Sequence, residues 1–464
     1  MPQMLSENRE TISRKLARFA RELHYEQIPE EAVRAANCFL LDSLGCAFAA
    51  LDNPDMQAAY RYIQGLGGAE QASIIGYGAK TNLPNAALMN SLLIRALDYN
   101  DIYWKEDPSH PSDVIPAALA PAELRGLSGK ELLVGIVIAY ELEMRLSRAS
   151  HPGIREVGWH HASLTQFVSP LVVGRLLDLS EDQLVAAVGI SGSSHFTMGV
   201  VVAGHLTNMK NTADPLAVEA GVRAALLAAQ GYTGPTEVFE GKEGLFEVIS
   251  NVRWEPEALL DGLGEKFFIT ECAFKAFPTE ALTHQPITAV LELAHEHKID
   301  PHAVKEVLVE TTTRGADILS DPSKYKPTTK ETADHSLPYC IAVAIAKGNV
   351  LPSDFEEEAL KDPLVWELLP KIRVVANPEI DALFPKVKRA IVTITMNDGQ
   401  SYRKQEDFAK GEPERPLSDE ELLAKFRANA QAALSNKQQE NLIQATLEIE
   451  KFADIRDYVP LLKR

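Results

Sequence analysis

Apolar residues between positions 1 and 266 recur at the spacing of one face of an α-helix. Clusters of Pro, Gly, Ser and Asn separate these periodic segments and mark helix starts and stops. The pattern predicts helices over 9–27, 32–50, 53–64, 85–96, 112–120, 127–148, 164–177, 180–192 and 215–230. Segment 32–50 is almost continuously apolar, which is typical of a helix buried in a helical domain.

The pattern changes near residue 267, where β-branched and aromatic residues become frequent. Strands are predicted over 267–270, 304–313, 372–375 and 389–396. Asn397-Asp398-Gly399 follows the last strand and is a hairpin signal. Helices are predicted over 280–295 and 336–346, and two amphipathic helices follow between residues 416 and 451.

We therefore predict a mainly α fold with a smaller α+β domain. The helical domain covers 1–266 and the α+β domain covers 267–404. The C-terminal helices, 405–464, are expected to pack back on the helical domain, because no Pro-rich linker separates them from the rest.

The charge balance changes the list of partners. The chain has 46 Lys+Arg against 65 Asp+Glu, a formal net charge of −19. This argues against binding to nucleic acid or to a membrane surface. It does not argue against a small anion as ligand, because salt screens distant charges and the charges of the local pocket determine what binds there. The N-terminus has no apolar signal-like core, so a cytoplasmic location is expected.

Four cysteines occur, and none forms a C-x-x-C pair. A dehydratase of the aconitase type needs closely spaced thiolates for its iron–sulfur cluster, and this framework is missing. Cys38, Cys46, Cys272 and Cys340 are predicted to be buried as small apolar residues.

Segment 97–112 carries the densest candidate chemistry. Asp98 and His110 lie there among Tyr and Trp rings, between two apolar helices. A titratable pair held between helix ends is typical of an active-site loop. Asp-Pro-Ser-His-Pro-Ser-Asp is equally good turn and N-cap chemistry, so residue types alone leave function and structure evenly balanced.

Two further candidates stand at predicted helix starts. His160 and His161 follow Trp159, where a helix N-terminus favours neutral imidazole and bound anions. Alone, one would be expected as a cap and the other exposed. Lys210 precedes helix 215–230, a position at which its charge opposes the helix dipole. It either pairs with Asp214 at i+4 or binds an anion.

Six motifs in this order resemble the MmgE/PrpD family, which contains 2-methylcitrate dehydratases and cis-aconitate decarboxylases. They are Asp42-Ser43-Leu44-Gly45-Cys46, Leu97-Asp98-Tyr99-Asn100-Asp101 with His110-Pro111-Ser112-Asp113, Gly158-Trp159-His160-His161, Lys210, Phe274-Lys275-Ala276-Phe277-Pro278 with His284, and Ala333-Asp334-His335-Ser336-Leu337-Pro338-Tyr339. The resemblance implies a helical domain built from both chain ends, an α+β lid, a homodimer, a site between the domains, and chemistry without metal or other cofactor.

The resemblance also assigns roles to single residues. The catalytic positions are Asp98, His110, His160 and His161. One histidine of the adjacent pair aligns with Gly-Phe-His of decarboxylases and the other with Gly-Trp-Asp-His of dehydratases. The substrate-binding positions are Lys210, Lys275, Tyr325 and His335, although His335 is also interpreted as an anchor of the lid.

The activity expected from the resemblance is dehydration of 2-methylcitrate to 2-methyl-aconitate. By this resemblance, Ile102 stands at a position where decarboxylases have a Thr. The sequence of residues 333–339 is similar to that of dehydratases. The residues around Lys210 lack the Trp and Gly of typical dehydratases, which leaves the substrate open. The alternatives are a decarboxylase, isomerase or epimerase of a related polycarboxylate, or an inactive carboxylate-binding homologue.

Overall fold

The computed structural model describes residues 10–203 and 206–464. The N-terminal segment that bears on export lies outside these ranges. The described residues are mainly helical with small sheets, which confirms the predicted mainly α class with a smaller α+β part. Two large clusters of buried apolar side chains organise the chain.

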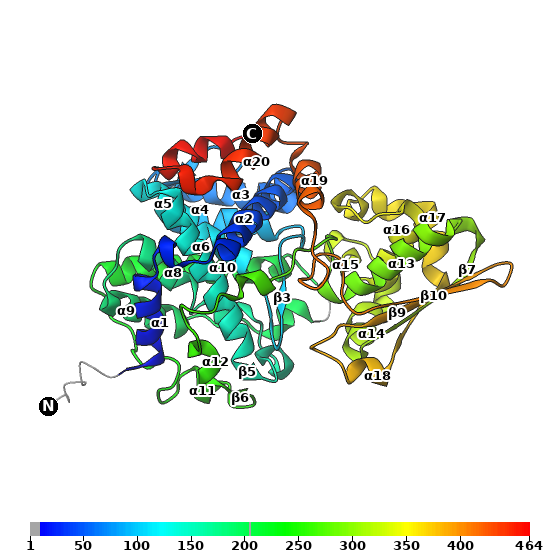
Figure 1. Ribbon diagram of the computed structural model, residues 1–464, viewed down its shortest axis with the longest axis horizontal. Helices are drawn as coiled ribbons and strands as arrows, with labels where there is room; N and C mark the ends of the chain where they lie inside the picture. Colours follow the sequence, from blue (N-terminus) through cyan, green and yellow to red (C-terminus); the bar gives the residue numbers. More distant parts are fainter. Residues whose placement is uncertain (1–9, 204–205) are drawn as a thin grey trace.

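The larger cluster joins residues from both ends of the sequence, between 12 and 272 and between 426 and 462. Its helices are α1 (Ile12–Glu22), α2 (Glu30–Ala50), α3 (Pro54–Leu66), α4 (Leu83–Arg95), α5 (Ile115–Arg125), α6 (Gly129–Arg148), α7 (Ala162–Thr165), α8 (Ser169–Leu176), α9 (Glu181–Gly192), α10 (Met209–Ala229), α11 (Leu245–Val248), α12 (Pro256–Leu260), α19 (Asp419–Ala430) and α20 (Asn436–Leu447). Figure 1 shows α19 and α20 beside the N-terminal helices, and α19 packs on α2.

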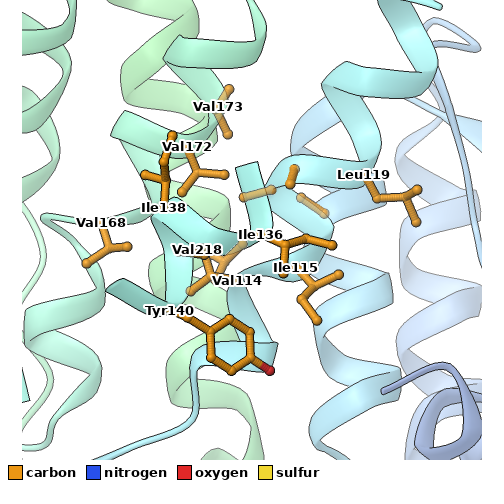
Figure 2. Packing of buried hydrophobic residues seen from close by; sticks show 14 of the residues in the cluster. Val114, Ile115, Leu119, Ile136, Ile138, Tyr140, Val168, Val172, Val173 and Val218 are labelled. Atoms are coloured by element: carbon orange, nitrogen blue, oxygen red, sulfur yellow. The ribbon is translucent and has the colours of Figure 1, made fainter. Parts of the chain in front are cut away.

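Branched aliphatic side chains fill the centre of this cluster. Figure 2 shows Ile115, at the start of α5, beside Ile136 of α6, and Ile138 of α6 beside Val172 of α8. Helix α2 is the one helix of the described residues long and apolar enough to cross a membrane, yet 72% of its apolar window is buried inside the protein. The prediction that this segment is a buried core helix is confirmed.

The smaller cluster surrounds a four-stranded sheet of order β10-β9-β7-β8. Its strands are β7 (Val304–Thr311), β8 (Ile372–Ala376), β9 (Ala390–Met396) and β10 (Ser401–Glu406). β7 runs parallel to β8 and antiparallel to β9. The hairpin predicted at Asn397-Asp398-Gly399 joins β9 to β10 and places Gly399 at φ 90°. The helices of this part are α13 (His284–His297), α14 (Thr313–Ser320), α15 (Lys330–Ala333), α16 (Leu337–Lys347), α17 (Pro363–Leu368) and α18 (Pro378–Asp381).

Six two-residue strands form three small ladders within the helical part. They are β1 (Ala72–Ser73) with β2 (Lys80–Thr81), β3 (Tyr103–Trp104) with β4 (Pro108–Ser109), and β5 (Ser150–His151) with β6 (Arg253–Trp254). The β3–β4 ladder folds segment 97–112 into a tight loop. This loop returns the chain from the end of α4 to the start of α5.

Three sequence predictions of local structure were wrong. Residues 267–270 form no strand but enter a 3-10 turn, Phe268–Glu271, which packs on α6. The helix predicted over 164–177 is divided into α7 and α8, because Pro170 begins a new helical segment. Helix α10 starts at Met209 and not at Pro215, so the proline lies inside it.

Candidate active site

One cavity gathers every predicted site residue except Tyr325. The residues that line it come from the helical part and from the segments that lead to α13 and α16. They are Arg95, Asp98, Ile102, Trp104, Pro108, His110, Arg155, His160, His161, Val202, Lys210, Lys275, Glu280, Ala281 and His335. Residues separated widely in sequence thus converge on one space.

Tyr325 does not line this cavity. Its ring packs against the smaller cluster, and its hydroxyl donates a hydrogen bond to the Ile372 carbonyl at 3.1 Å. Its assignment to substrate binding stays a prediction.

Asp98 is the electrostatic centre of the cavity. It follows the end of α4 in a left-handed conformation, φ 49°, which non-glycine residues adopt uncommonly. Its Oδ1 accepts hydrogen bonds from Arg95 and, at 2.7 Å, from the Lys275 ammonium. Its Oδ2 lies 2.8 Å from the Lys210 Nζ. One carboxylate therefore faces three cations.

The protonation states of Asp98 and Lys210 follow from burial and from the neighbouring charges. Burial raises the pKa of Asp98, but Arg95, Lys210 and Lys275 outweigh it and hold the pKa well below the usual range. Asp98 is therefore ionised. Burial, with a smaller contribution from Arg95, lowers the pKa of Lys210 to about 8 although Asp98 opposes this.

The two lysines differ in their free donors. Lys275 donates to the Asp98 carboxylate, to the Asp98 carbonyl at 3.1 Å and to the Thr279 carbonyl at 3.0 Å, which uses all three N–H groups. Lys210 is buried and its ammonium makes no hydrogen bond of good geometry with any described residue. Its contact with Asp98 leaves N–H donors for a ligand. The alternative that Lys210 pairs with Asp214 was wrong.

His110 is held as a neutral imidazole. Its Nδ1 lies 2.7 Å from the Asp101 carbonyl, which only accepts, so Nδ1 carries the proton. Its Nε2 lies 3.2 Å from the Arg95 guanidinium, which only donates, so Nε2 presents its lone pair. Burial and the nearby Arg95 and Lys275 hold its pKa well below the usual value.

His160 and His161 both line the cavity, with ring centroids 3.9 Å apart. The His160 Nδ1 accepts a hydrogen bond from the Ala162 backbone N–H at 3.2 Å, which leaves the proton on Nε2. The His161 Nε2 lies 3.3 Å from an oxygen of Asp214 on α10. Burial raises the pKa of Asp214, but His161 outweighs it and brings the pKa well below the usual range, so a carboxylate orients this imidazole.

His335 enters the cavity from the start of α16. Its Nδ1 lies 2.5 Å from Asp334, whose other oxygen lies 2.8 Å from Lys330. Burial, with Lys210, lowers the pKa of His335 to about 4. The imidazole is thus neutral and oriented by a carboxylate, while the ring itself reaches the cavity.

Other polar residues of segment 97–112 support the backbone, as the second interpretation of that segment proposed. Asp101 accepts hydrogen bonds from the Ser112 hydroxyl at 2.6 Å and from its backbone N–H at 3.1 Å. Asp107 accepts from the backbone of Ile154 at 2.6 Å. The segment therefore combines cavity residues with turn chemistry.

Sequence reasoning missed three charged residues of the cavity, Arg95, Arg155 and Glu280. Arg95 lies three residues before Asp98 at a helix end, a spacing at which an ion pair is common, so this signal was present. Arg155 stands in a short 3-10 turn, Ile154–Val157, without any pattern that marks it.

Among the described residues, one group has ligand atoms close enough to hold a metal ion. It consists of His160, His161 and Asp214, whose ligand atoms lie within 4.8 Å of one another. Two imidazoles and a carboxylate are a donor set that zinc accepts. The same three residues also form an oriented acid–base group without any metal.

Neutral imidazoles, an ionised aspartate and a lysine with spare donors in one buried cavity define an acid–base enzyme site. The chain belongs to the MmgE/PrpD family. The MmgE/PrpD N-terminal domain matches residues 14–257, and the MmgE/PrpD C-terminal domain matches residues 277–451.

Curated relatives cover nearly the whole chain. The chain is 26% identical to the cis-aconitate decarboxylase-like protein oryM of Aspergillus oryzae, over 97% of each chain. It is 26% identical to human cis-aconitate decarboxylase, over 98% of this chain and 95% of the relative. It is 25% identical to 2-methylcitrate dehydratase of Salmonella typhimurium, over 92% of each. These similarities support a lyase-type enzyme without selecting its substrate.

Proposed function

We propose that this protein is a metal-independent lyase that dehydrates 2-methylcitrate to 2-methyl-aconitate. The observation that carries the proposal is the convergence of Asp98, Lys210 and neutral histidines in one cavity. Dehydration of a β-hydroxy acid needs a base for a weakly acidic C–H, cations for the charge that develops on the adjacent carboxylate, and an acid for the departing hydroxyl.

Lys210 is the group best placed to bind the substrate carboxylate next to the reacting C–H. Its ammonium has unused donors, and a fixed cation stabilises the enediolate that forms when the proton leaves. Lys275 and Arg95 are occupied by Asp98, so they hold this carboxylate and keep the cavity positive. Asp98 is ionised, and its role in this scheme is to position Lys210.

The histidines move the protons. His161, oriented by Asp214, or its neighbour His160 removes the C–H proton on a ring nitrogen. The electron pair of that C–H bond becomes the new C=C bond, and the C–O bond breaks. The imidazolium formed in this step gives its proton to the departing hydroxyl, which leaves as water, so the step starts and ends with the same charges on the protein; His110 belongs to the same proton-transfer group.

A second candidate is decarboxylation of cis-aconitate, or isomerisation or epimerisation of a similar acid, supported by the relatives named as cis-aconitate decarboxylases. The same acid–base groups would then move protons in a reaction that loses CO₂, or no group at all, in place of water. Ile102 lines the cavity with an alkyl group, at a position where the family resemblance places a threonine hydroxyl in decarboxylases. This difference favours dehydration. An inactive carboxylate-binding homologue is a third candidate, and the retained acid–base groups argue against it.

The remaining assignments belong to the same proposal. We propose domain limits at 267 and 404, with the helices after 404 packed on the helical domain. The two hydrophobic clusters support a division of this kind, with the difference that Ile269 and Cys272 still pack in the larger cluster. A cytoplasmic homodimer without nucleic-acid or membrane partners, and with Tyr325 near the substrate, completes the proposal by resemblance to the family.

The direct test replaces Asp98 and His110. Asp98→Asn keeps the shape but removes the charge that positions Lys210, and His110→Ala removes an imidazole. We expect each to lower kcat on 2-methylcitrate by roughly 10²-fold or more, followed by absorbance of the unsaturated product. His302→Ala, at an exposed histidine, is the control. Unchanged kcat in both cavity variants with folding intact would remove the assignment.

A further inference from the structure

Arg155 lines the cavity and has no part in the mechanism above. Its backbone N–H donates to Asp107 at 3.1 Å, and its guanidinium lies 5.9 Å from the Trp104 ring centroid. Within residues 10–203 and 206–464, no side chain or carbonyl forms a hydrogen bond or ion pair with this guanidinium. Five N–H donors are therefore left without a protein acceptor.

Arg95 and Lys275, unlike Arg155, have acceptors for their N–H donors within the protein. Arg95 contacts Asp98 and His110, and Lys275 has all its donors in use. Burial lowers the pKa of Arg155, although Glu280 and Asp107 oppose this, so its charge is partly desolvated. A desolvated guanidinium without an acceptor in hydrogen-bond contact is costly in free energy, and a carboxylate fits its planar fork through two parallel hydrogen bonds.

Arg314 shows that stacking on Trp104 does not require a free guanidinium. Its Cζ lies 5.6 Å from the same ring, a distance close to that of Arg155. Arg314 is paired with Glu156 and does not line the cavity. The two arginines thus share one aromatic neighbour, but only Arg155 presents unpaired donors to the space in which the substrate is proposed to bind.

We propose that Arg155 binds a second carboxylate of the substrate, distinct from the one at Lys210, and that it selects polycarboxylates over acids with one carboxylate fewer. This inference rests on the proposed function. It deepens that function by assigning the residue that recognises the carboxylate remote from the reacting bond. Arg155 is a specificity-determining residue here and takes no proton.

Binding of two unreactive acids tests this assignment. Propane-1,2,3-tricarboxylate and 2-methylbutanedioate share a carbon framework, except that a methyl group replaces one carboxymethyl arm. Isothermal titration of the wild type should show a preference for the tricarboxylate of roughly 10- to 100-fold, the value of a charge-assisted pair of hydrogen bonds. Arg155→Gln should remove this preference by weakening the tricarboxylate alone.

Two further variants control for structural effects. Arg155→Lys keeps the charge without the fork and should retain part of the preference. Arg314→Gln should retain all of it. Equal weakening of both acids by Arg155→Gln, an undiminished preference in that variant, or no preference in the wild type would overturn the inference alone. A wild type that binds neither acid would overturn the proposed function, and the inference with it.

Discussion

Lys210 shows how single residues tune the site. Burial lowers its pKa to about 8 while the Asp98 carboxylate opposes the shift. The ammonium is thus charged below pH 8 and loses its charge above it. Since kcat/KM reports the free enzyme, we expect kcat/KM on 2-methylcitrate to fall as the pH rises through about 8.

Lys210→Arg separates this residue from other titrating groups. Arginine keeps its charge at all accessible pH values. The alkaline fall of kcat/KM should therefore disappear from the region of pH 8, even if the variant is slower. Lys210→Ala should lose most activity at every pH. An alkaline limb that stays in place in Lys210→Arg would show that another group titrates there.

At the residue scale, seven of the eight residues that the resemblance assigned to the site line one cavity. Pairing was harder to predict, because Lys210 has an aspartate four residues away in Asp214. Folding instead brings Asp98 to it, and Asp214 is left for His161. Arg155 carried no sequence signal, since its importance lies in the partners that it lacks.

Helix α6 carries polar residues on a buried face. Glu141 and Arg145 form an i,i+4 ion pair at 2.7 Å with both side chains fully buried. Glu143 accepts a hydrogen bond from the Ser109 hydroxyl at 2.9 Å. Burial raises the pKa of Glu143 from 4.5 to about 8, with Asp214 adding to the shift. The folded protein therefore holds this carboxyl protonated at neutral pH.

Glu143→Gln tests this titration. Because the pKa of Glu143 is higher in the folded than in the unfolded protein, its protonated form stabilises the fold. This contribution is fully present below the unfolded pKa of about 4.5 and is lost as the pH rises through about 8. Glutamine cannot titrate. Between pH 5 and 8 the free energy of unfolding of the variant should therefore gain on the wild type by up to about 1.4 kcal/mol per pH unit, measured by urea unfolding.

The control is Glu22→Gln, at the exposed glutamate that ends helix α1. Its unfolding curves should shift equally at each pH. A constant difference between Glu143→Gln and the wild type from pH 5 to 8 would contradict a buried, protonated Glu143.

At the element scale, capping signals predicted helix starts well. Asn53, Ser128 and Ser180 each accept backbone N–H groups at the start of a helix. Short apolar runs were ambiguous, and 267–270 was misread because strand and turn share aromatic residues. The interior Pro215 is tolerated in α10, where tertiary packing overrides local preference.

At the scale of the whole molecule, the C-terminal helices contact the loop that carries Asp98. Lys425 on α19 lies 2.7 Å from Asp42 on α2, and both side chains are buried. The same ammonium donates to the Tyr99 carbonyl at 2.8 Å, one residue after Asp98. A single lysine therefore joins the two ends of the chain to the loop that holds the central carboxylate.

Lys425→Ala should destabilise the protein and disturb the site. It leaves Asp42 buried and unpaired, which costs about 3–5 kcal/mol in unfolding free energy. The matched control is Arg34→Ala, which breaks the exposed pair of Arg34 with Asp419 between the same two helices. That pair is worth about 0–1 kcal/mol. Equal melting temperatures of the two variants would contradict the role given to Lys425.

The fold class was predictable from sequence because periodicity separates helices from strands. How the two clusters meet was not. Trp104 comes from the loop after α4 but packs into the smaller cluster, and three cations from different segments surround its ring. Contacts of this kind join residues far apart in the chain, and no local pattern encodes them.

The most direct test of the central claim is product analysis of the wild type by NMR. Purified protein is incubated with 2-methylcitrate and, separately, with cis-aconitate, each with and without a chelator. The account predicts that 2-methylcitrate loses water to give 2-methyl-aconitate at the same rate with chelator present. No loss of water from 2-methylcitrate, release of CO₂ from cis-aconitate as the dominant reaction, or activity abolished by the chelator would contradict it.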